Sequence, residues 1–285
     1  MTTVWAGLSV GAIYVLVALG YNIVFITAGT FNFANANLIM VGVFIAYWGL
    51  VQVGLPVFVV FLVAGAGVLL VAGAEERVAF RPVKHHDGHL VTSVGAATLI
   101  TGVVQLIWGA DALQVPFIAK NNPTSVLGGR VVPVELWLIG LALVGAFGLH
   151  ALLRWTMVGL ASLAASEDRE AASLRGVNTR WLGLGGFALS GALAGVIGPF
   201  VGPKTFAFAG LAIALALKGF VAMAMGGFGS ISGCVVGGFV TGLVEALTAR
   251  WVGGTYEDLT VFALLLVILM VRPTGLLGER TERII

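Results

Sequence analysis

One charged segment interrupts an otherwise apolar chain at residues 154–180, RWTMVGLASLAASEDREAASLRGVNTR. Long apolar runs lie on both sides of it. Its charged residues are Arg154, Glu167, Asp168, Arg169, Glu170, Arg175 and Arg180. A polar helix-forming segment held between two membrane spans usually touches something soluble, because a short helix fits a groove on a partner. We therefore expect this segment to indicate the function.

Short helical stretches within this segment have one apolar side and one solvated side. The apolar side consists of Leu160, Leu163, Ala164 and Leu174. The side chains expected in solvent are Glu167, Asp168, Arg169 and Glu170. Gly176 is expected to end the helix, since glycine favours the left-handed position that follows a helix. The residues alone leave two interpretations open, a helix that docks on a partner and an ordinary solvated loop that fixes the topology.

The composition of the whole chain indicates a membrane protein. Of its 285 residues, 59% are hydrophobic and only 10% are charged, whereas soluble domains carry about 25% charged residues. Several apolar runs reach the roughly 20 residues that a helix needs to cross a bilayer. They lack the alternation expected of a transmembrane barrel. The sequence predicts an all-α polytopic membrane protein with eight or nine transmembrane helices.

The apolar runs define nine candidate spans, whose edges are placed to within a few residues. They lie at about 4–27, 34–52, 56–74, 90–110, 135–153, 181–202, 207–226, 230–249 and 256–271. Residues 207–249 hold either one crossing or two, because Lys218 and a glycine cluster could break a span there. No part is large enough to form a separate soluble domain, so we expect a single transmembrane domain over residues 1–285.

Three loops, 75–89, 154–180 and 272–285, hold most of the lysines and arginines. Such loops face the cytoplasm by the positive-inside rule. With nine crossings, the N-terminus is then outside, the C-terminus is cytoplasmic, and loop 111–134 is external. The N-terminus lacks a basic region followed by a cleavage site, so we expect a retained first helix.

The chain lacks the residues that would let it supply its own energy. There is no G-x-x-x-x-G-K-[ST] phosphate loop for binding ATP. Apart from Glu135, Glu257 and Asp258 at the edges of spans, Glu245 is the only acid within a predicted span, whereas ion-coupled carriers need buried ionisable relays. Energy is therefore expected to enter from outside the chain, through the charged segment. The alternative is a stand-alone channel or an ion-coupled secondary carrier.

A membrane enzyme is a further alternative, based on a small histidine cluster in loop 75–89. The cluster consists of His85, His86 and His89 with Asp87. Convergent acids or a nucleophile, which an enzyme would need, are not evident around it. We therefore expect neither enzymatic activity nor a bound metal or other cofactor in this chain.

Four stretches resemble the permease subunits of ABC transporters of the branched-chain amino acid type. AASEDREAASLRGVN, within the charged segment, resembles the cytoplasmic-loop pattern A-x-x-E-[DN]-x-x-x-A-x-x-x-G-[IV]-[ND]. The other three are GLSVGAIYVLVALGYNIVF near the N-terminus, KGFVAMAMGGFGSISGCVVGGFVTGLVE, and RPTGLLG near the C-terminus. They occur in the family's order and span nearly the whole chain, which resembles the shorter of the two permeases of such a system.

This resemblance implies a permease subunit of an ABC importer in a prokaryotic inner membrane. The implied partners are a second permease subunit in a heterodimer, two ATP-binding subunits and an extracytoplasmic solute-binding protein, with no nucleic acid. ATP and Mg would be bound by the partner subunits, whose closure would move residues 160–178 and rearrange the spans. By its match to the family motif, this segment would dock on the ATPase through Glu167, Asp168, Ala172, Leu174, Gly176 and Val177.

Asparagines interrupt the first two apolar runs. Unpaired amides in hydrocarbon cost several kcal/mol, so they must face protein, water or solute. Two roles stay open: lining a solute pathway, and interhelical hydrogen bonding worth about 1 kcal/mol. On a continuous helix Asn32 and Asn35 would share a face without Asn37, whereas in a broken helix all three could converge. The predicted pathway residues are Asn22, Asn32, Asn35, Asn37 and Gln105.

The asparagine segment is also where the chain departs from the family pattern. The family reads N-F-A-H-G-E, whereas residues 32–37 here read NFANAN. Neutral amides therefore replace the histidine and the glutamate, and they are less suited to holding an ammonium group. The solute class stays open among amino acids, urea or short amides, and small organic acids.

The glycine-rich segment after Lys218 favours close helix packing and a turn at residues 226–230. Its glycines are Gly226, Gly227, Gly229, Gly233, Gly237, Gly238 and Gly242. Glu245, which follows, is expected to pair with Arg250 near the outer surface. For Lys218 itself the sequence indicates no single role.

Overall fold

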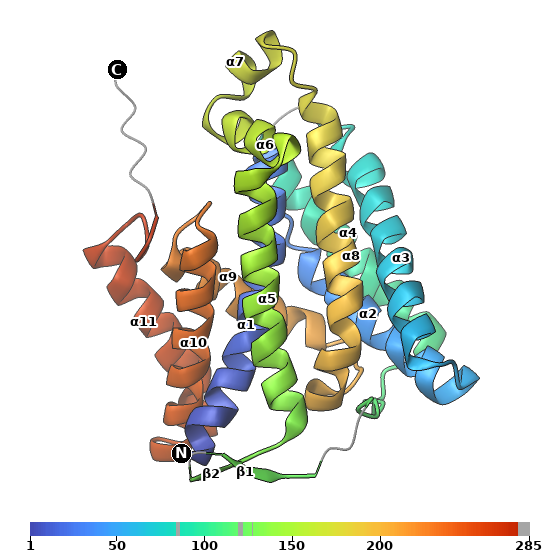
Figure 1. The fold of residues 1–285 in the computed structure, drawn as a ribbon, viewed down its shortest axis with the longest axis vertical. Coiled ribbons are helices and arrows are strands. Elements are labelled where there is room, and N and C mark those ends of the chain that lie inside the picture. The colour runs from blue at the N-terminus through green and yellow to red at the C-terminus, as the bar shows by residue number, and fades with distance from the viewer. Residues whose placement is uncertain (84–85, 119–121, 127, 279–285) are drawn as a thin grey trace. The chain divides into compact units, whose positions relative to one another are not determined.

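The chain folds into helices connected by short loops, as shown by a computed structural model that describes residues 1–83, 86–118, 122–126 and 128–278 (Figure 1). The helices are α1 (Thr2–Ala28), α2 (Asn35–Tyr47), α3 (Val57–Glu75), α4 (His86–Trp108), α5 (Pro133–Trp155), α6 (Met157–Glu167), α7 (Arg169–Leu174), α8 (Thr179–Thr205), α9 (Leu211–Gly226), α10 (Ile231–Trp251) and α11 (Glu257–Val271). The shorter elements are two π-helical segments, η1 (Trp48–Val53) and η2 (Glu76–Phe80), a 3-10 turn, η3 (Gly254–Tyr256), and two strands, β1 (Thr124–Val126) and β2 (Gly129–Val131).

Eight helical segments within the described residues are long and apolar enough to cross a membrane. They are Thr2–Ala28, Asn35–Val53, Val57–Phe80, Gly88–Trp108, Pro133–Trp155, Thr179–Thr205, Ile231–Trp251 and Gly254–Val271. The predicted all-α polytopic fold is therefore confirmed. The remaining predicted span is α9, which has 16 residues and a length of about 24 Å.

The helices form two compact units. Unit 1 consists of Met1–Asn22, Asn122–Phe147 and Lys218–Ile285. Unit 2 consists of Ile23–Asn121 and Gly148–Leu217. Each unit contains membrane-crossing helices, and α1, α5 and α9 contribute residues to both.

In unit 1, α1 and α10 pack against each other in opposite directions. Gly7 lies against Leu243, while the Sγ of Cys234 lies 3.7 Å from the carbonyl oxygen of Ala18. Small residues allow this close approach. The predicted packing role of the glycine run is confirmed, because an added methyl group would overlap the backbone of a neighbouring helix at Gly237, Gly238 and Gly242.

The short helix α9 runs in the same direction as α1. Gly219 lies against Val17 of α1. Just beyond the end of α9, the N–H of Gly229 donates to the Asn22 Oδ1 at 2.9 Å. The predicted turn is present here, with φ of +81° at Gly229, a conformation that favours glycine.

Helix α11 in turn follows the direction of α9. Near its start, the Asp258 carboxylate reaches Lys218, and beyond its end the N–H of Leu276 donates to the carbonyl oxygen of Met225. The start of α1 and the end of α11 are therefore at opposite ends of unit 1. Opposite ends of this kind agree with an odd number of crossings, in which α9 would be a ninth, shorter one. Residues 207–249 thus form two helices, α9 and α10, and a crossing by α9 stays a prediction.

The loop between α4 and α5 carries a small antiparallel hairpin of β1 and β2. This hairpin lies beside the start of α1 in unit 1 (Figure 1). The N–H of Arg130 donates to the Thr2 Oγ1 at 3.3 Å, and the Trp5 indole N–H donates to the carbonyl oxygen of Val126 at 3.3 Å. The hairpin and the N-terminus therefore lie at the same end of unit 1.

In unit 2, α8 packs closely against both α2 and α3. Gly42 of α2 lies against the backbone of Ala194 and Gly195. Where α1 ends, an apolar cluster joins Val24 to Phe80 and Phe187. Loop 75–89 therefore begins at the end of unit 2 that also holds the end of α1.

Candidate functional site

The charged segment forms two short helices, α6 and α7, between the end of α5 and the start of α8 (Figure 1). Thr156 caps α6, since its Oγ1 accepts the Gly159 N–H at 3.0 Å. Asp168 caps α7 by accepting the N–H groups of Glu170 and Ala171 at 3.0 and 2.9 Å. Such caps satisfy backbone donors that a helix start leaves free. Asp168, predicted for docking, therefore also has a local role in shaping the segment.

The predicted helix stop at Gly176 is confirmed. Gly176 has φ of +89°, and its N–H donates to the carbonyl oxygen of Ser173 at 3.0 Å. The next N–H, of Val177, donates to the carbonyl oxygen of Ala172 at 3.1 Å. This pair of bonds is the Schellman motif. Three predicted docking residues thus set the shape of the segment, and Ala172 is itself buried.

Other side chains of the segment are available to a partner. Glu167 is exposed at the end of α6. Leu174, on α7, is 84% exposed. It is one of several exposed apolar residues on the two helices, the others being Met157, Val158 and Leu160. A short helix with such side chains is suited to binding in a groove.

The prediction that Arg169 lies in solvent is wrong. Its half-buried guanidinium donates to the carbonyl oxygens of Ala28 and Thr27, at the end of α1. It also donates to the carbonyl oxygen of Thr179, at the start of α8, at 3.2 Å. Burial lowers the pKa of Arg169, although a guanidinium stays charged in proteins. The positive charge suits the negative end of the α1 dipole, and the bonds tie α7 to both helices.

The helix breaks directly after these carbonyl groups. Gly29 has φ of +68°, and its Cα lies close to the Arg169 guanidinium. Asn32 is in the connecting turn, and Asn35 begins α2. Of the two geometries considered for the asparagine segment, the broken helix is therefore the one present.

The three asparagines of this segment contact different helices and do not converge. The Asn37 Nδ2 donates to the carbonyl oxygen of Ala97 at 2.9 Å and to the Thr101 Oγ1 at 2.7 Å, both on α4. The Asn35 Oδ1 accepts the Ser190 hydroxyl of α8 at 2.5 Å. Interhelical hydrogen bonding is therefore confirmed for Asn35 and Asn37, whereas pathway lining stays a prediction.

Asn32 has a different environment. Its Oδ1 accepts the N–H of Ala34 at 2.9 Å. Its Nδ2 faces the Glu75 carboxyl group, but neither this nitrogen nor either carboxyl oxygen makes a hydrogen bond of normal geometry within the described residues. The Nδ2 of Asn35 is likewise buried without a partner there.

The two other predicted pathway residues lie elsewhere. Asn22 is buried in unit 1, where it holds the turn at Gly229. Gln105 is exposed on α4. A shared pathway surface for these two and the other asparagines therefore stays a prediction.

Glu75 was missed because the sequence analysis placed it in a loop, and that boundary is wrong. α3 includes Glu75, and η2 extends the apolar span to Phe80. Glu75 is only 6% exposed, so Glu245 is not the only acid within a span. Helical periodicity could have found it, since Glu75 lies on the face of α3 that also buries Val68 and Ala72.

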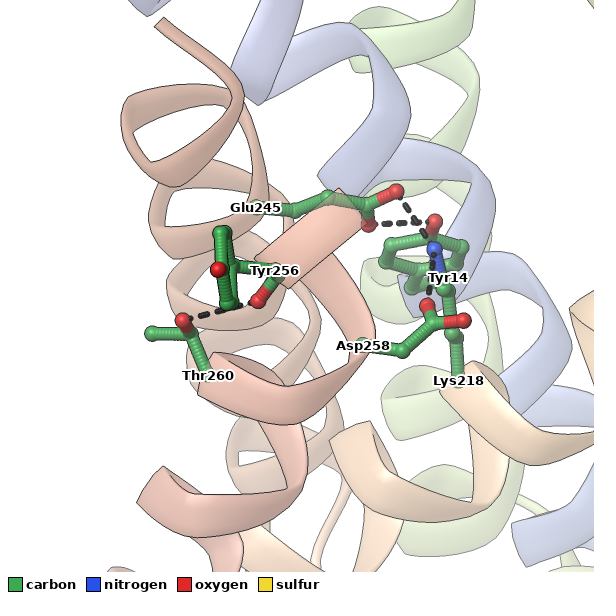
Figure 2. A network of polar contacts seen from close by, with 6 residues as sticks. All are labelled: Tyr14, Lys218, Glu245, Tyr256, Asp258 and Thr260. Atoms are coloured by element: carbon green, nitrogen blue, oxygen red, sulfur yellow. Dashed lines mark hydrogen bonds and ion pairs between the residues drawn. The ribbon is translucent and has the colours of Figure 1, made fainter. Parts of the chain in front are cut away.

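Unit 1 contains a polar network within its apolar helices (Figure 2). The Lys218 ammonium group lies 2.6 Å from the Glu245 carboxylate and 3.1 Å from the Asp258 carboxylate. The Tyr14 hydroxyl donates to the second Glu245 oxygen at 2.6 Å. Lys218 and Glu245 are 15% and 13% exposed, whereas Asp258 is 69% exposed. Lys218 therefore has a defined role as the cation of this network.

The predicted pairing of Glu245 with Arg250 is wrong. Arg250 donates instead to the Thr3 Oγ1 at 2.6 Å. Glu245 lies five positions before Arg250, so the two side chains are on different faces of α10. The lysine that pairs with Glu245 comes from α9, a long-range contact that local spacing could not reveal.

The histidine cluster lies largely outside the described part of the chain. His85 is not described, and neither are the side chains of His86 and Asp87. The His89 Nε2 lies 3.1 Å from the carbonyl oxygen of Val83. Among the described residues, no group of three or more side chains is arranged to hold a metal.

Comparison with known proteins decides the family. The sequence model of one protein family, described as the permease component of the branched-chain amino acid transport system, matches residues 3–270. The chain belongs to this permease family. The resemblance inferred from four stretches of sequence is thereby confirmed.

Relatives of this permease cover nearly its whole length. LivH of Escherichia coli K12, a high-affinity branched-chain amino acid transport system permease, is 29% identical, covering 96% of this chain and 94% of LivH. BraD of Pseudomonas aeruginosa, described in the same words, is 30% identical with the same coverage. A probable LivH of Methanocaldococcus jannaschii is 28% identical, covering 93% of this chain and 88% of the relative. The family is therefore that of a transport permease, a multi-pass membrane component of a larger system.

A solved structure has a similar fold. It is PsaBC from Streptococcus pneumoniae in complex with Fab, with a TM-score of 0.51, 12% identity, and coverage of 96% of this chain and 93% of the other. At this identity the likeness concerns the fold of the permease alone.

Proposed function

We propose that the chain is the permease subunit of an ATP-driven importer in a prokaryotic inner membrane. Its partners are a second permease subunit, two ATP-binding subunits that hold ATP and Mg, and an extracytoplasmic solute-binding protein. The names of LivH and BraD make a branched-chain amino acid the first solute to test. Urea, short amides and small organic acids are the other members of the panel. The permease itself moves solute and performs no covalent chemistry.

The Arg169 link is the observation that carries this proposal. The segment α6–α7 presents exposed apolar side chains to a partner, while Arg169 holds the end of α1 and the start of α8. A displacement of α7 must therefore move Ala28 and Thr179 or break these bonds. Rigid helices joined in this way are suited to passing motion between sites. The helix break that leads to Asn32 directly follows Ala28, so the motion reaches the turn that holds Asn32.

The charge distribution supports an orientation with the N-terminus outside and the C-terminus in the cytoplasm. Loops 75–89, 154–180 and 272–285 carry most of the basic residues, and such loops face the cytoplasm. In this orientation α6 and α7 meet the ATP-binding subunits, and the β1–β2 hairpin faces the solute-binding protein. An odd number of crossings agrees with termini on opposite sides.

Co-purification tests the partnership. The chain, tagged and co-expressed with the ATP-binding subunits of its system, is expected to bring down ATPase activity. Leu174→Asp places a charge on the exposed face of α7 and is expected to reduce the captured ATPase at least tenfold. Ser125→Asp introduces the same charge into the hairpin, which is also exposed, and is expected to leave capture unchanged. Failure of the wild-type chain to associate with any ATPase would overturn the proposal.

A further inference from the structure

Glu75 has an environment that the transport role described so far does not use. The residue ends α3, is 6% exposed, and has both carboxyl oxygens buried without a hydrogen-bond partner among the described residues. No lysine, arginine or histidine side chain in the described part of the chain forms an ion pair with it. An ionised carboxylate buried in this way costs several kcal/mol. Such a group needs a partner that the described part of the chain does not supply.

The surroundings of Glu75 define the chemistry of that partner. A carboxylate has about four acceptor sites, and the Asn32 amide that faces it can satisfy only a small part of them. The ionised carboxyl group would have an unbalanced negative charge and several open acceptor sites, so the ligand that complements it carries a positive charge and several N–H donors. An ammonium group has both properties, with three donors on one charged nitrogen.

Asn32 and Asn35 are the asparagines of this segment whose amide nitrogens have no hydrogen-bond partner in the described part of unit 2. Both residues are almost fully buried, and the Nδ2 of each has no partner among the described residues. Their oxygens are already used, by Ala34 and by Ser190. The Asn35 nitrogen is thus held free for an acceptor on the ligand, whereas the Asn32 nitrogen faces the Glu75 carboxyl group.

The local backbone also distinguishes this position. η2, a π-helical segment, begins at Glu76, immediately after Glu75. Interruptions of this kind are rare inside helices and frequent at functional sites. The break between α1 and α2 places Asn32 in a turn opposite this segment. Two interrupted helices in unit 2 therefore meet at the Glu75–Asn32 pair.

We propose that Glu75, held by the Asn32 amide that faces it, binds the ammonium group of the transported solute and so determines specificity for a primary amine. This inference rests on the proposed importer function and deepens it, since it assigns the solute-recognition residue. It also supplies the charge that residues 32–37 lack, because Glu75 brings a carboxyl group to Asn32 from a different helix.

A thermal-shift titration of the purified full chain in detergent tests this assignment without requiring transport. The probes are L-leucine, 3-methylbutylamine, which lacks the carboxylate, and 4-methylpentanoate, which lacks the amine. The two amines are expected to raise the melting temperature of the wild-type chain, and 4-methylpentanoate is not. In Glu75→Gln the concentration of amine needed for the same shift is expected to rise at least tenfold. Glu257→Gln, which removes a carboxylate in unit 1, is the matched control and is expected to respond as wild type.

The melting temperature without ligand separates a binding role from a structural one. If Glu75 is a site for ligand, its carboxyl oxygens make no hydrogen bond that Glu75→Gln could remove, so the unliganded variant is expected to be at least as stable as wild type. A lower melting temperature with an unchanged response to amines would identify a structural carboxyl group and overturn the proposal. A Glu75-dependent shift produced by potassium or sodium chloride, without one by the amines, would assign the site to an inorganic cation and overturn it as well.

The ligand titration and the ATPase test can fail independently, so failure of the Glu75 site and failure of the importer function are distinguishable. If ATPase subunits associate and respond to urea or organic acids but not to amines, the importer function stands and the Glu75 assignment falls. If amines bind through Glu75 but no ATPase associates, the site stands and the importer function falls.

Discussion

At the residue scale, individual polar contacts explain how the helices are joined, which the overall composition does not. Arg169 is the clearest case, because one side chain connects three helices. It lies between two exposed acids, Asp168 and Glu170, in a segment that looks fully solvated in the sequence. Its direction is set by the Asp168 cap, which starts a new helix at Arg169 and turns it towards the end of α1. A pattern of neighbouring charges could not reveal a contact with residues so far away in the chain.

Arg169→Ala is expected to uncouple ATP hydrolysis from transport. The variant loses three charged hydrogen bonds, a class worth about 1.5–3 kcal/mol each when buried and less at a half-exposed site. In proteoliposomes, solute uptake per ATP hydrolysed is expected to fall at least fivefold while the ATPase subunits stay bound. Arg169→Lys is expected to be intermediate, since an ammonium group cannot reproduce the guanidinium geometry. Arg175→Ala, at an exposed arginine of the same segment, is the control, and normal coupling in Arg169→Ala would contradict the account.

The Lys218 network leads to a second expectation, about stability. Lys218→Met leaves Glu245 buried without its cation, which is expected to lower the free energy of unfolding by about 3 kcal/mol. Removing Glu245 as well, in Lys218→Met/Glu245→Gln, is expected to restore most of that loss because no uncompensated charge remains. Asp258→Ala should have little effect at a side chain that is 69% exposed. Melting temperatures in detergent measure all three, and a double variant no more stable than Lys218→Met would contradict this reading.

At the element scale, small residues determine how closely the helices approach. α1 and α10 meet where Gly11 and Gly242 face each other. In lipid such contacts are a main source of helix association, because burying apolar surface gives little advantage there. The glycine run of α10 therefore fixes the position of α1 in unit 1.

Gly242→Ala is expected to destabilise the protein. Its new methyl group would overlap the backbone of Gly11, and overpacking of this kind costs about 1–3 kcal/mol. Gly140→Ala is the matched control, since a methyl group there meets no other atom. The measurement is the melting temperature of the two variants side by side. Equal melting temperatures would show that close packing at Gly242 does not limit stability.

Much of the fold at this scale could be predicted from the sequence. Apolar length and loop charge located the membrane helices, and the position of Gly176 located the end of α7. The end of α3 was misplaced because Glu75 and Glu76 look like the start of a loop, although tertiary packing buries Glu75. The roles of the asparagines could not be predicted either, since they depend on which helix each amide meets.

At the scale of the whole molecule, the helix directions within unit 1 favour nine membrane crossings, with α9 as the shortest. Eight long helices alone would leave the two ends of the chain on the same side. The shared direction of α1, α9 and α11 instead places the start of α1 and the end of α11 at opposite ends of unit 1. The crossing number is thus a consequence of long-range pairing, which hydropathy alone left between eight and nine.

Cysteine labelling in intact cells is expected to show this topology. The single native cysteine, Cys234, is fully buried, so background labelling should be low. A membrane-impermeant maleimide is expected to label Ser125→Cys in the hairpin from outside. Ser173→Cys on α7 should react only after the cells are opened. The reverse pattern would invert the proposed orientation.

ATP-driven uptake by the reconstituted system tests the central claim most directly. The permease, its second permease subunit, the ATP-binding subunits and the solute-binding protein are placed in proteoliposomes, and uptake of leucine, urea, acetamide and benzoate is measured with ATP or ADP. The account predicts accumulation of one solute class that requires ATP, the solute-binding protein and an intact Arg169. Solute flux that is the same without ATP and without the partner subunits would contradict it, and would identify the chain as a channel or carrier that works alone.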